Sequence, residues 1–151
     1  MNNSDQNYRL ELTEEDYQKA YVEVAFLLDA FAGTIDNIMG GKTAPVGRIA
    51  GRDTARKLPL ELSDPTLEEV LAALGGQMQA GFEFSLDGDG LVFRRCILRQ
   101  MCGLRHIETG TALCRLFHAY FDGIVNGLLS RPVKSEFVSV GDACHLKIAV
   151  Q

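Results

Sequence analysis

The chain has 151 residues, of which 46% are hydrophobic and 23% are charged, and its formal net charge is −5. This length and this balance are typical of one globular domain and exclude a disordered chain. The negative charge argues against a nucleic acid or an anionic membrane as the main partner, because both attract basic surfaces.

The start of the chain, MNNSDQNY, is polar and does not resemble a signal peptide. No apolar run approaches the roughly 18 residues that a membrane-spanning helix requires. We therefore expect a cytoplasmic protein with no membrane span, made of a polar N-terminal segment (residues 1–12) and a single ligand-binding domain (residues 13–151). In a reducing compartment the four cysteines are expected to be thiols or metal ligands.

The first predicted element is a helix from Thr13 to about Met39. Thr13 is a suitable N-cap, acidic residues 14–16 favour the positive end of the helix dipole, and Gly40-Gly41 ends the pattern. Apolar residues recur at alternating steps of four and three, as in a coiled-coil seam: Tyr17, Tyr21, Val24, Leu28, Phe31, Ile35 and Ile38. The pattern fits either an ordinary core-facing helix or the interface of a homodimer. Further apolar residues beside the seam support the homodimer.

A second helix is predicted over about Pro45–Lys57, where the proline can occupy the first turn. Its Gly47-x-x-x-Gly51 motif places two glycines one turn apart, which lets another backbone come close. The preceding GGKT sequence is not a phosphate-binding loop, because it follows a helix and lacks the glycine five residues earlier. Basic residues at 48, 52 and 56 form a stripe that is either a solvated face or an edge that recognises carboxylates or a partner.

A third helix is predicted to begin with Asp64 as its N-cap and to end near Gly75-Gly76 or shortly after. The period then changes to two, since Phe82, Phe84 and Leu86 alternate with polar residues, which predicts a strand. The sequence Asp87-Gly88-Asp89-Gly90 predicts a hairpin turn and Leu91–Cys96 the return strand. Residues 97–108 are expected to form a loop or a short irregular element.

A long helix is predicted over Thr109–Leu129, followed by two strands, Val133–Val140 and Cys144–Val150, that flank a tight turn. Alternation in the last strand predicts that Cys144 points inward and that His145 points outward. The complete order predicts an α+β fold, with three N-terminal helices and then strand-strand-helix-strand-strand around an antiparallel sheet.

Five soft metal ligands are expected near one end of this sheet: Cys96, Cys102, Cys114, Cys144 and His118. Four thiolates there could hold one zinc ion or an iron–sulfur cluster, with His118 as a substitute ligand. Their spacing matches no recognised zinc-finger or ferredoxin pattern. Separately buried cysteines that behave as small hydrophobic residues, and a redox-active thiol switch, therefore stay open as alternatives. We expect no haem.

The sequence gives little support for catalysis, because it contains neither Gly-x-Ser-x-Gly nor His-Glu-x-x-His. Cys114 and His118 share one face of a helix and could form a nucleophile–base pair, but a spacing of four residues is common by chance. Asp122 is the one evident candidate for an orienting acid. We therefore expect a binding or sensing module more than an enzyme.

Three parts of the C-terminal region carry a family resemblance: Cys114, the stretch Phe121–Leu129 (FDGIVNGLL) and the stretch Val140–Leu146 (VGDACHL). They resemble the 4-vinyl-reductase-type, or hydrocarbon-binding, domain family, over about residues 40–150. That family is related in fold to transport-particle (TRAPP) subunits and to haem nitric-oxide-binding domains. Family members often carry another cysteine where this chain has Glu136-Phe137, and the spacer before Cys144 is one residue short. The zinc arrangement of the family is therefore not transferred.

The resemblance implies that an apolar ligand lies between the helices and the sheet. Its walls would include seven residues that also suit a plain core: Phe82, Phe84, Phe93, Leu116, Phe117, Tyr120 and Phe121. We thus expect a small-molecule-binding or sensing module whose partners are an apolar small molecule and a second copy of the chain. The alternatives are an iron–sulfur or zinc redox or sensor protein, and a subunit of a tetrapyrrole- or cofactor-processing enzyme.

Overall fold

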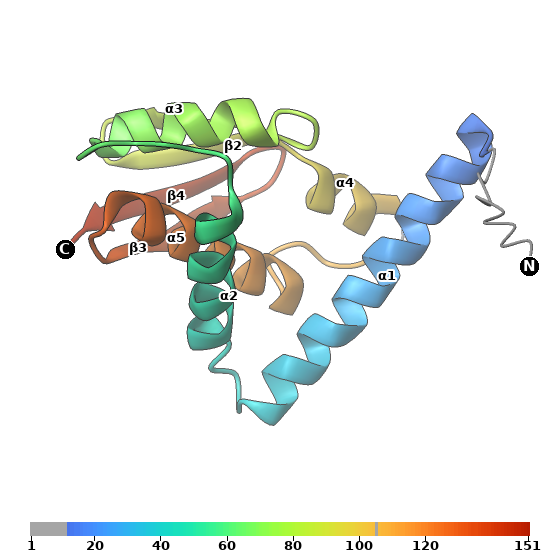
Figure 1. The fold of residues 1–151 in the computed structure, drawn as a ribbon. Coiled ribbons are helices and arrows are strands. Elements are labelled where there is room, and N and C mark those ends of the chain that lie inside the picture. The colour runs from blue at the N-terminus through green and yellow to red at the C-terminus, as the bar shows by residue number, and fades with distance from the viewer. Residues whose placement is uncertain (1–11, 105) are drawn as a thin grey trace, which may run out of the picture.

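The computed structural model describes residues 12–104 and 106–151, so most of the expected polar N-terminal segment lies outside the described residues. Helices and strands follow one another as shown in Figure 1. Their bounds are α1 (Glu14–Ile38), α2 (Ala44–Lys57), α3 (Leu67–Met78), β1 (Phe82–Asp87), β2 (Gly90–Cys96), α4 (Ile97–Leu104), α5 (Ala112–Leu129), β3 (Val133–Val140) and β4 (Cys144–Val150). The predicted α+β fold is confirmed. Among these helices, none is both long enough and apolar enough to cross a membrane.

The four strands form one sheet in the order β1-β2-β4-β3, and each neighbouring pair is antiparallel. Alternation separates the two faces, since Cys144 and Leu146 in β4 are buried while His145 and Lys147 are exposed, as predicted. Helix α3 packs along β1, helix α5 packs along β3, and the two helices also contact each other. Both helices therefore cover the same face of the sheet (Figure 1).

Phenylalanine rings fill the space between α5 and the sheet. Phe93 of β2 and Phe121 of α5 are 1% and 0% exposed, and their ring centroids lie 5.2 Å apart in an edge-to-face arrangement. Phe84 of β1 contacts both rings at 5.0 Å. Edge-to-face pairs at these distances are favourable aromatic contacts. This cluster fixes α5, the helix that carries half of the predicted site residues, against the sheet.

Glycines bring α2 and α5 into backbone contact. A Cβ atom added at Gly51 would lie 2.0 Å from the carbonyl oxygen of Tyr120, and one added at Gly123 would lie 2.4 Å from that of Arg48. Gly47 and Gly127 face α5 and α2, respectively, at similar closeness. Both helices thus use glycines spaced by four residues. The prediction that Gly47-x-x-x-Gly51 admits another backbone is confirmed, and that backbone belongs to α5.

Two predicted helix starts are wrong by a few residues. Helix α3 begins after Thr66 and not after Asp64, because Thr66 and Glu69 form a reciprocal capping box. The Glu69 N–H donates to Thr66 Oγ1 at 3.2 Å and the Thr66 N–H donates to Glu69 Oε2 at 2.8 Å. Helix α5 begins at Ala112 and not at Thr109, since Gly110 adopts a φ of +79°, outside the helical region.

The segment predicted as a loop or irregular element contains helix α4. Its buried residues Leu98, Met101 and Cys102 have the spacing of three and four that defines one face of a helix. Arg99 holds the start of α4 to the sheet, since its guanidinium donates to the backbone oxygens of Phe93 and Arg94 at 3.3 and 2.8 Å. The helix was not predicted because the segment is short and its apolar spacing covers only two turns.

Helix α1 runs as a long arm beside the rest of the molecule (Figure 1). Its main contacts are with α5 and α4, and its buried residues are the small Ala25 and Ala32. Six of the seven seam residues are more than 40% exposed, with Phe31 at 59% and Ile38 at 77%. In the single chain the seam residues are therefore not packed into a core. The structure does not support the prediction that α1 is an ordinary core-facing helix.

Candidate functional site

An apolar groove lies between helix α1 and the body of the protein, by which we mean the other helices and the sheet. Its volume is about 620 Å³. All five helices and the start of β1 line it. From α1 and α2 come Tyr21, Val24, Leu28, Ile35, Val46, Gly47 and Ala50. From the rest of the chain come Met78, Phe82, Ile97, Leu98, Met101, Leu113, Leu116, Phe117 and Tyr120. Four of the seven predicted wall residues are among them, namely Phe82, Leu116, Phe117 and Tyr120.

The other three predicted wall residues lie in the core. Phe93 and Phe121 are fully buried, and Phe84 packs against that core. The sequence did not indicate the contributions of α1, α2 and α4 to the groove. Spacing shows which face of each helix is apolar, but the placement of α1 opposite α5 depends on tertiary packing. For α4 the apolar spacing of Leu98 and Met101 could have revealed the helix.

The groove is lined almost entirely by apolar side chains. Among the described residues that line it, the only side-chain oxygen atoms are the hydroxyl groups of Tyr21 and Tyr120. Phe82 and Phe117 stack with their ring centroids 4.8 Å apart and their planes 5° from parallel, which gives one wall a flat aromatic surface. An apolar surface of this kind can bind hydrocarbon by excluding water and offers little that would select a charged group.

The groove exists because α2 packs closely against α5, whereas α1 packs less closely against the body. Glycines bring α2 and α5 into backbone contact, whereas α1 touches the body mainly through Ala25 and Ala32. The larger seam residues Val24 and Leu28 are 50% and 41% exposed and line the space that results. The same residues therefore explain both the exposed seam and the groove.

The four cysteines are buried and free, and no disulfide joins them. Burial, with smaller contributions from the charges of Cys114, Asp29 and Cys96, raises the pKa of Cys102 to about 11. Burial likewise raises the pKa of Cys96 and of Cys114, each with smaller contributions from other cysteines. The thiols thus lie in one neighbourhood, and those three are protonated near neutral pH, where a protonated thiol is neither a good nucleophile nor a metal ligand.

Across residues 12–104 and 106–151, no group of three or more histidine, cysteine, aspartate or glutamate side chains is arranged to hold a metal ion. Cys144 instead accepts a hydrogen bond from Arg99 Nη1, with a nitrogen–sulfur distance of 3.3 Å. A metal would require the side chains to reorient and the thiols to lose their protons. The zinc or iron–sulfur centre stays a prediction.

His118 is buried, at 7% exposed, among the rings of Phe93, Phe117 and Phe137. Burial lowers the pKa of His118 to about 4, so its imidazole is neutral near pH 7. Its Nδ1 atom has no hydrogen-bond partner among the described residues. A buried polar atom in this state costs ~1–3 kcal/mol unless something else satisfies it.

Asp122 does not act as an orienting acid for His118, so the Cys114–His118 pair that the sequence allows is not completed to a triad. Asp122 accepts hydrogen bonds from the N–H and the hydroxyl of Ser135, at 2.9 and 2.7 Å, and His118 Nδ1 is without a partner in the described part of the chain. Burial raises the pKa of Asp122, although the two Ser135 hydrogen bonds and Arg48 lower it. The role of Asp122 is thus to tie α5 to β3.

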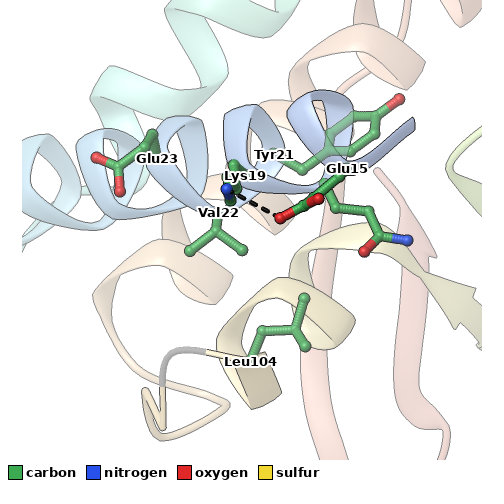
Figure 2. A pocket seen from close by; sticks show the side chains of 7 residues that line it. Glu15, Lys19, Tyr21, Val22, Glu23 and Leu104 are labelled. Carbon is green, nitrogen blue, oxygen red and sulfur yellow. Dashed lines mark ion pairs between the residues drawn. The ribbon is translucent and has the colours of Figure 1, made fainter. Parts of the chain in front are cut away.

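His118 lines a second, smaller pocket of about 240 Å³, which contains several basic side chains and none of the described cysteines. A third hollow, of about 630 Å³, lies where α1 passes the end of α4. Figure 2 shows that its rim carries the ion pair between Lys19 and Glu15, at 3.0 Å, with Leu104 across from it. Both partners of that pair are more than 70% exposed, so the third hollow is a solvated surface.

Comparison of the chain with models of known families, with curated proteins and with solved structures finds no match. The class that the fold defines is an α+β domain with helices on one face of an antiparallel sheet. The resemblance to hydrocarbon-binding domains stays a prediction.

Proposed function

We propose that the chain is a small-molecule-binding or sensing module that holds an apolar ligand in the groove between α1 and the body. The observation that carries this proposal is the groove itself, about 620 Å³ of space lined by carbon. Volumes of roughly 300–1,000 Å³ with few polar groups are usual for small-molecule sites. No enzymatic role is needed to explain such a site.

The affinity of the groove for aliphatic molecules should follow chain length. Each methylene group moved out of water contributes ~0.8 kcal/mol, which corresponds to about a fourfold gain in affinity at room temperature. Calorimetric titration of the wild-type protein with a series of linear alcohols, from hexanol to decanol, measures this gain directly. Affinity that does not depend on chain length would exclude the groove as a hydrocarbon site.

Single tryptophans can show where the alcohol binds, because the chain contains none. Leu116→Trp places an indole in the groove, and Leu104→Trp places one outside it on a residue that is 66% exposed. We expect saturable changes in fluorescence with decanol for Leu116→Trp and none for Leu104→Trp. Leu116→Trp should also weaken binding, since the larger ring occupies part of the groove. Equal responses from both variants would contradict the assignment.

We also propose that α1 mediates a homodimer. Its seam residues are exposed in the single chain, among them Tyr17 at 51%, Phe31 at 59% and Ile38 at 77%. A soluble monomer rarely leaves so many large apolar side chains in contact with water along one helix. Because Tyr21, Val24 and Leu28 belong both to the seam and to the groove, dimerisation would cover part of the groove mouth.

A further inference from the structure

The pocket that contains His118 lies across α5 from the apolar groove. Leu116, Phe117 and Tyr120 line the groove, whereas Arg115, His118 and Asp122 line the pocket of about 240 Å³. The start of α2 and strand β3 complete its walls. One helix thus separates an apolar space from a polar one.

Basic groups outnumber acidic ones in this pocket. Its charged lining residues are Lys42, Arg48, Arg115 and Lys134 against Asp122 and Glu136. Both acidic groups are already engaged, since Asp122 accepts two hydrogen bonds from Ser135 and Glu136 lies 3.4 Å from Lys134. Arg115 contacts Asp36, outside the pocket, at 3.3 Å. Among the described residues, Arg48 lies within salt-bridge distance of no carboxylate, although its charge acts on Asp122 and lowers the pKa of that carboxyl group.

Two buried polar atoms at this pocket are without partners in the described part of the chain, namely Arg48 Nε and His118 Nδ1. An arginine Nε always carries a hydrogen and is therefore a donor, and a neutral imidazole can carry its hydrogen on Nδ1. His118 is 7% exposed and is held in place by three aromatic rings. A buried donor without a partner calls for an acceptor from outside the chain, such as a bound ion or a water molecule.

The start of α2 adds to the positive potential. Residues 41–44 line the pocket, and Thr43, the N-cap, is 3% exposed and forms no side-chain capping bond. The N–H group of Ala44 has no partner within the helix, although Pro45 carries no N–H, and the helix dipole places partial positive charge at this end. This end of α2 therefore favours the same kind of ligand as Arg48 and His118.

We propose that this pocket binds a compact oxyanion, a carboxylate or a phosphate group, which accepts hydrogen bonds from Arg48 Nε and His118 Nδ1. Arginine's planar fork matches both kinds of oxyanion, and the pocket is large enough for one such group. The site does not depend on the apolar groove. Its sequence is not that of a phosphate-binding loop, so recognition rests on side chains from α2 and α5 together with the helix end.

Isothermal calorimetry with inorganic phosphate and, separately, with acetate tests the proposal at constant ionic strength. We expect saturable binding of at least one anion to the wild-type protein, and the preferred anion identifies the group. Arg48→Gln should weaken binding at least about tenfold, the equivalent of one charge-assisted hydrogen bond. Arg52→Gln removes the same charge one turn along α2, outside the pocket and on an exposed residue, and should change binding less than about twofold.

His118→Phe gives a second variant, which keeps an aromatic ring but removes Nδ1. It should also weaken anion binding, while the response of Leu116→Trp to decanol should persist in a His118→Phe background. Absence of binding by both anions to the wild-type protein would overturn the proposal. Equal losses in Arg48→Gln and Arg52→Gln would also overturn it, because they would indicate general attraction to a basic surface.

Discussion

The contact between α2 and α5 gives the most direct test of the fold. Gly51→Ala adds one methyl group whose carbon would lie 2.0 Å from the carbonyl oxygen of Tyr120, 2.8 Å from Gly123 Cα and 2.8 Å from Ile124 N. All three atoms belong to the backbone of α5, so no side chain can rotate away. Relieving the clash requires the two helices to separate by roughly 1 Å, since carbon–oxygen contacts below ~3.2 Å are strongly repulsive.

Overpacking of a well-packed core costs about 1–3 kcal/mol when side chains can adjust. Here a helix must move, and the movement also weakens the other close contacts of α2 with α5. We therefore expect Gly51→Ala to lower the free energy of unfolding by about 3–4 kcal/mol, which for a domain of this size lowers Tm by roughly 10 °C. Urea unfolding followed by far-ultraviolet circular dichroism measures the loss.

Gly75→Ala is the matched control. Gly75 also lies inside a helix, α3, but a Cβ atom there has no neighbour within 4 Å. Alanine is favoured over glycine in a helix by ~1 kcal/mol, so this variant should be as stable as the wild type or slightly more so. If Gly51→Ala unfolds within about 0.5 kcal/mol of the wild type, the close approach of α2 to α5 is wrong.

Four further predictions concern α1, His118 and the cysteines. Phe31→Glu should shift the protein from dimer to monomer in sedimentation measurements while Ala30→Glu, exposed on the same helix, should not; a wild-type monomer at high concentration would remove the dimer. Because the pKa of His118 falls from 6.5 unfolded to about 4 folded, its neutral form supports folding above pH 6.5, and this support is lost as the pH falls toward 4. Unfolding free energies of His118→Phe should therefore fall less steeply than those of the wild type over that window, and parallel curves would contradict the assignment. With the pKa of Cys102 raised to about 11, its thiol should resist iodoacetamide near neutral pH until the protein is unfolded. Metal analysis of anaerobically purified protein decides the zinc or iron–sulfur hypothesis, which fails if no metal is found and Cys96→Ser and Cys102→Ser leave stability unchanged.

Local signals in the sequence predicted several elements correctly where a single signal acts on its own neighbours. The bounds of β3 and β4 were predicted correctly, because alternation and the Gly141-Asp142 turn are both short-range features. The capping of α1 by Thr13 was also correct, with Asp16 forming the reciprocal bond. The start of α3 was wrong because Asp64-Pro65 and Thr66 are competing caps, and only Thr66 has a glutamate three residues later.

The candidate site was predictable only in part, because it depends on which helices become neighbours. The family resemblance implied that Phe117 and Tyr120 line a ligand site, and both line the groove, but it also implied Phe121, which lies in the core. No local feature of the sequence indicates that α1 lies opposite α5 with its seam residues exposed. The anion pocket was missed for a related reason, since Arg48 was identified as one member of a basic stripe while His118 was considered as a metal ligand.

The attachment of α1 through Ala25 and Ala32 has a consequence for the speed of ligand exchange. Two buried alanines and the partly exposed Arg115–Asp36 ion pair should hold a helix of 25 residues more weakly than the glycine contact holds α2. Detachment of α1 should therefore need much less free energy than global unfolding, so backbone amides of α1 should exchange with deuterium long before those of α5. If the groove holds an apolar ligand as proposed, the ligand should enter and leave by this local opening, so that its residence time would be set by α1 and not by the stability of the domain.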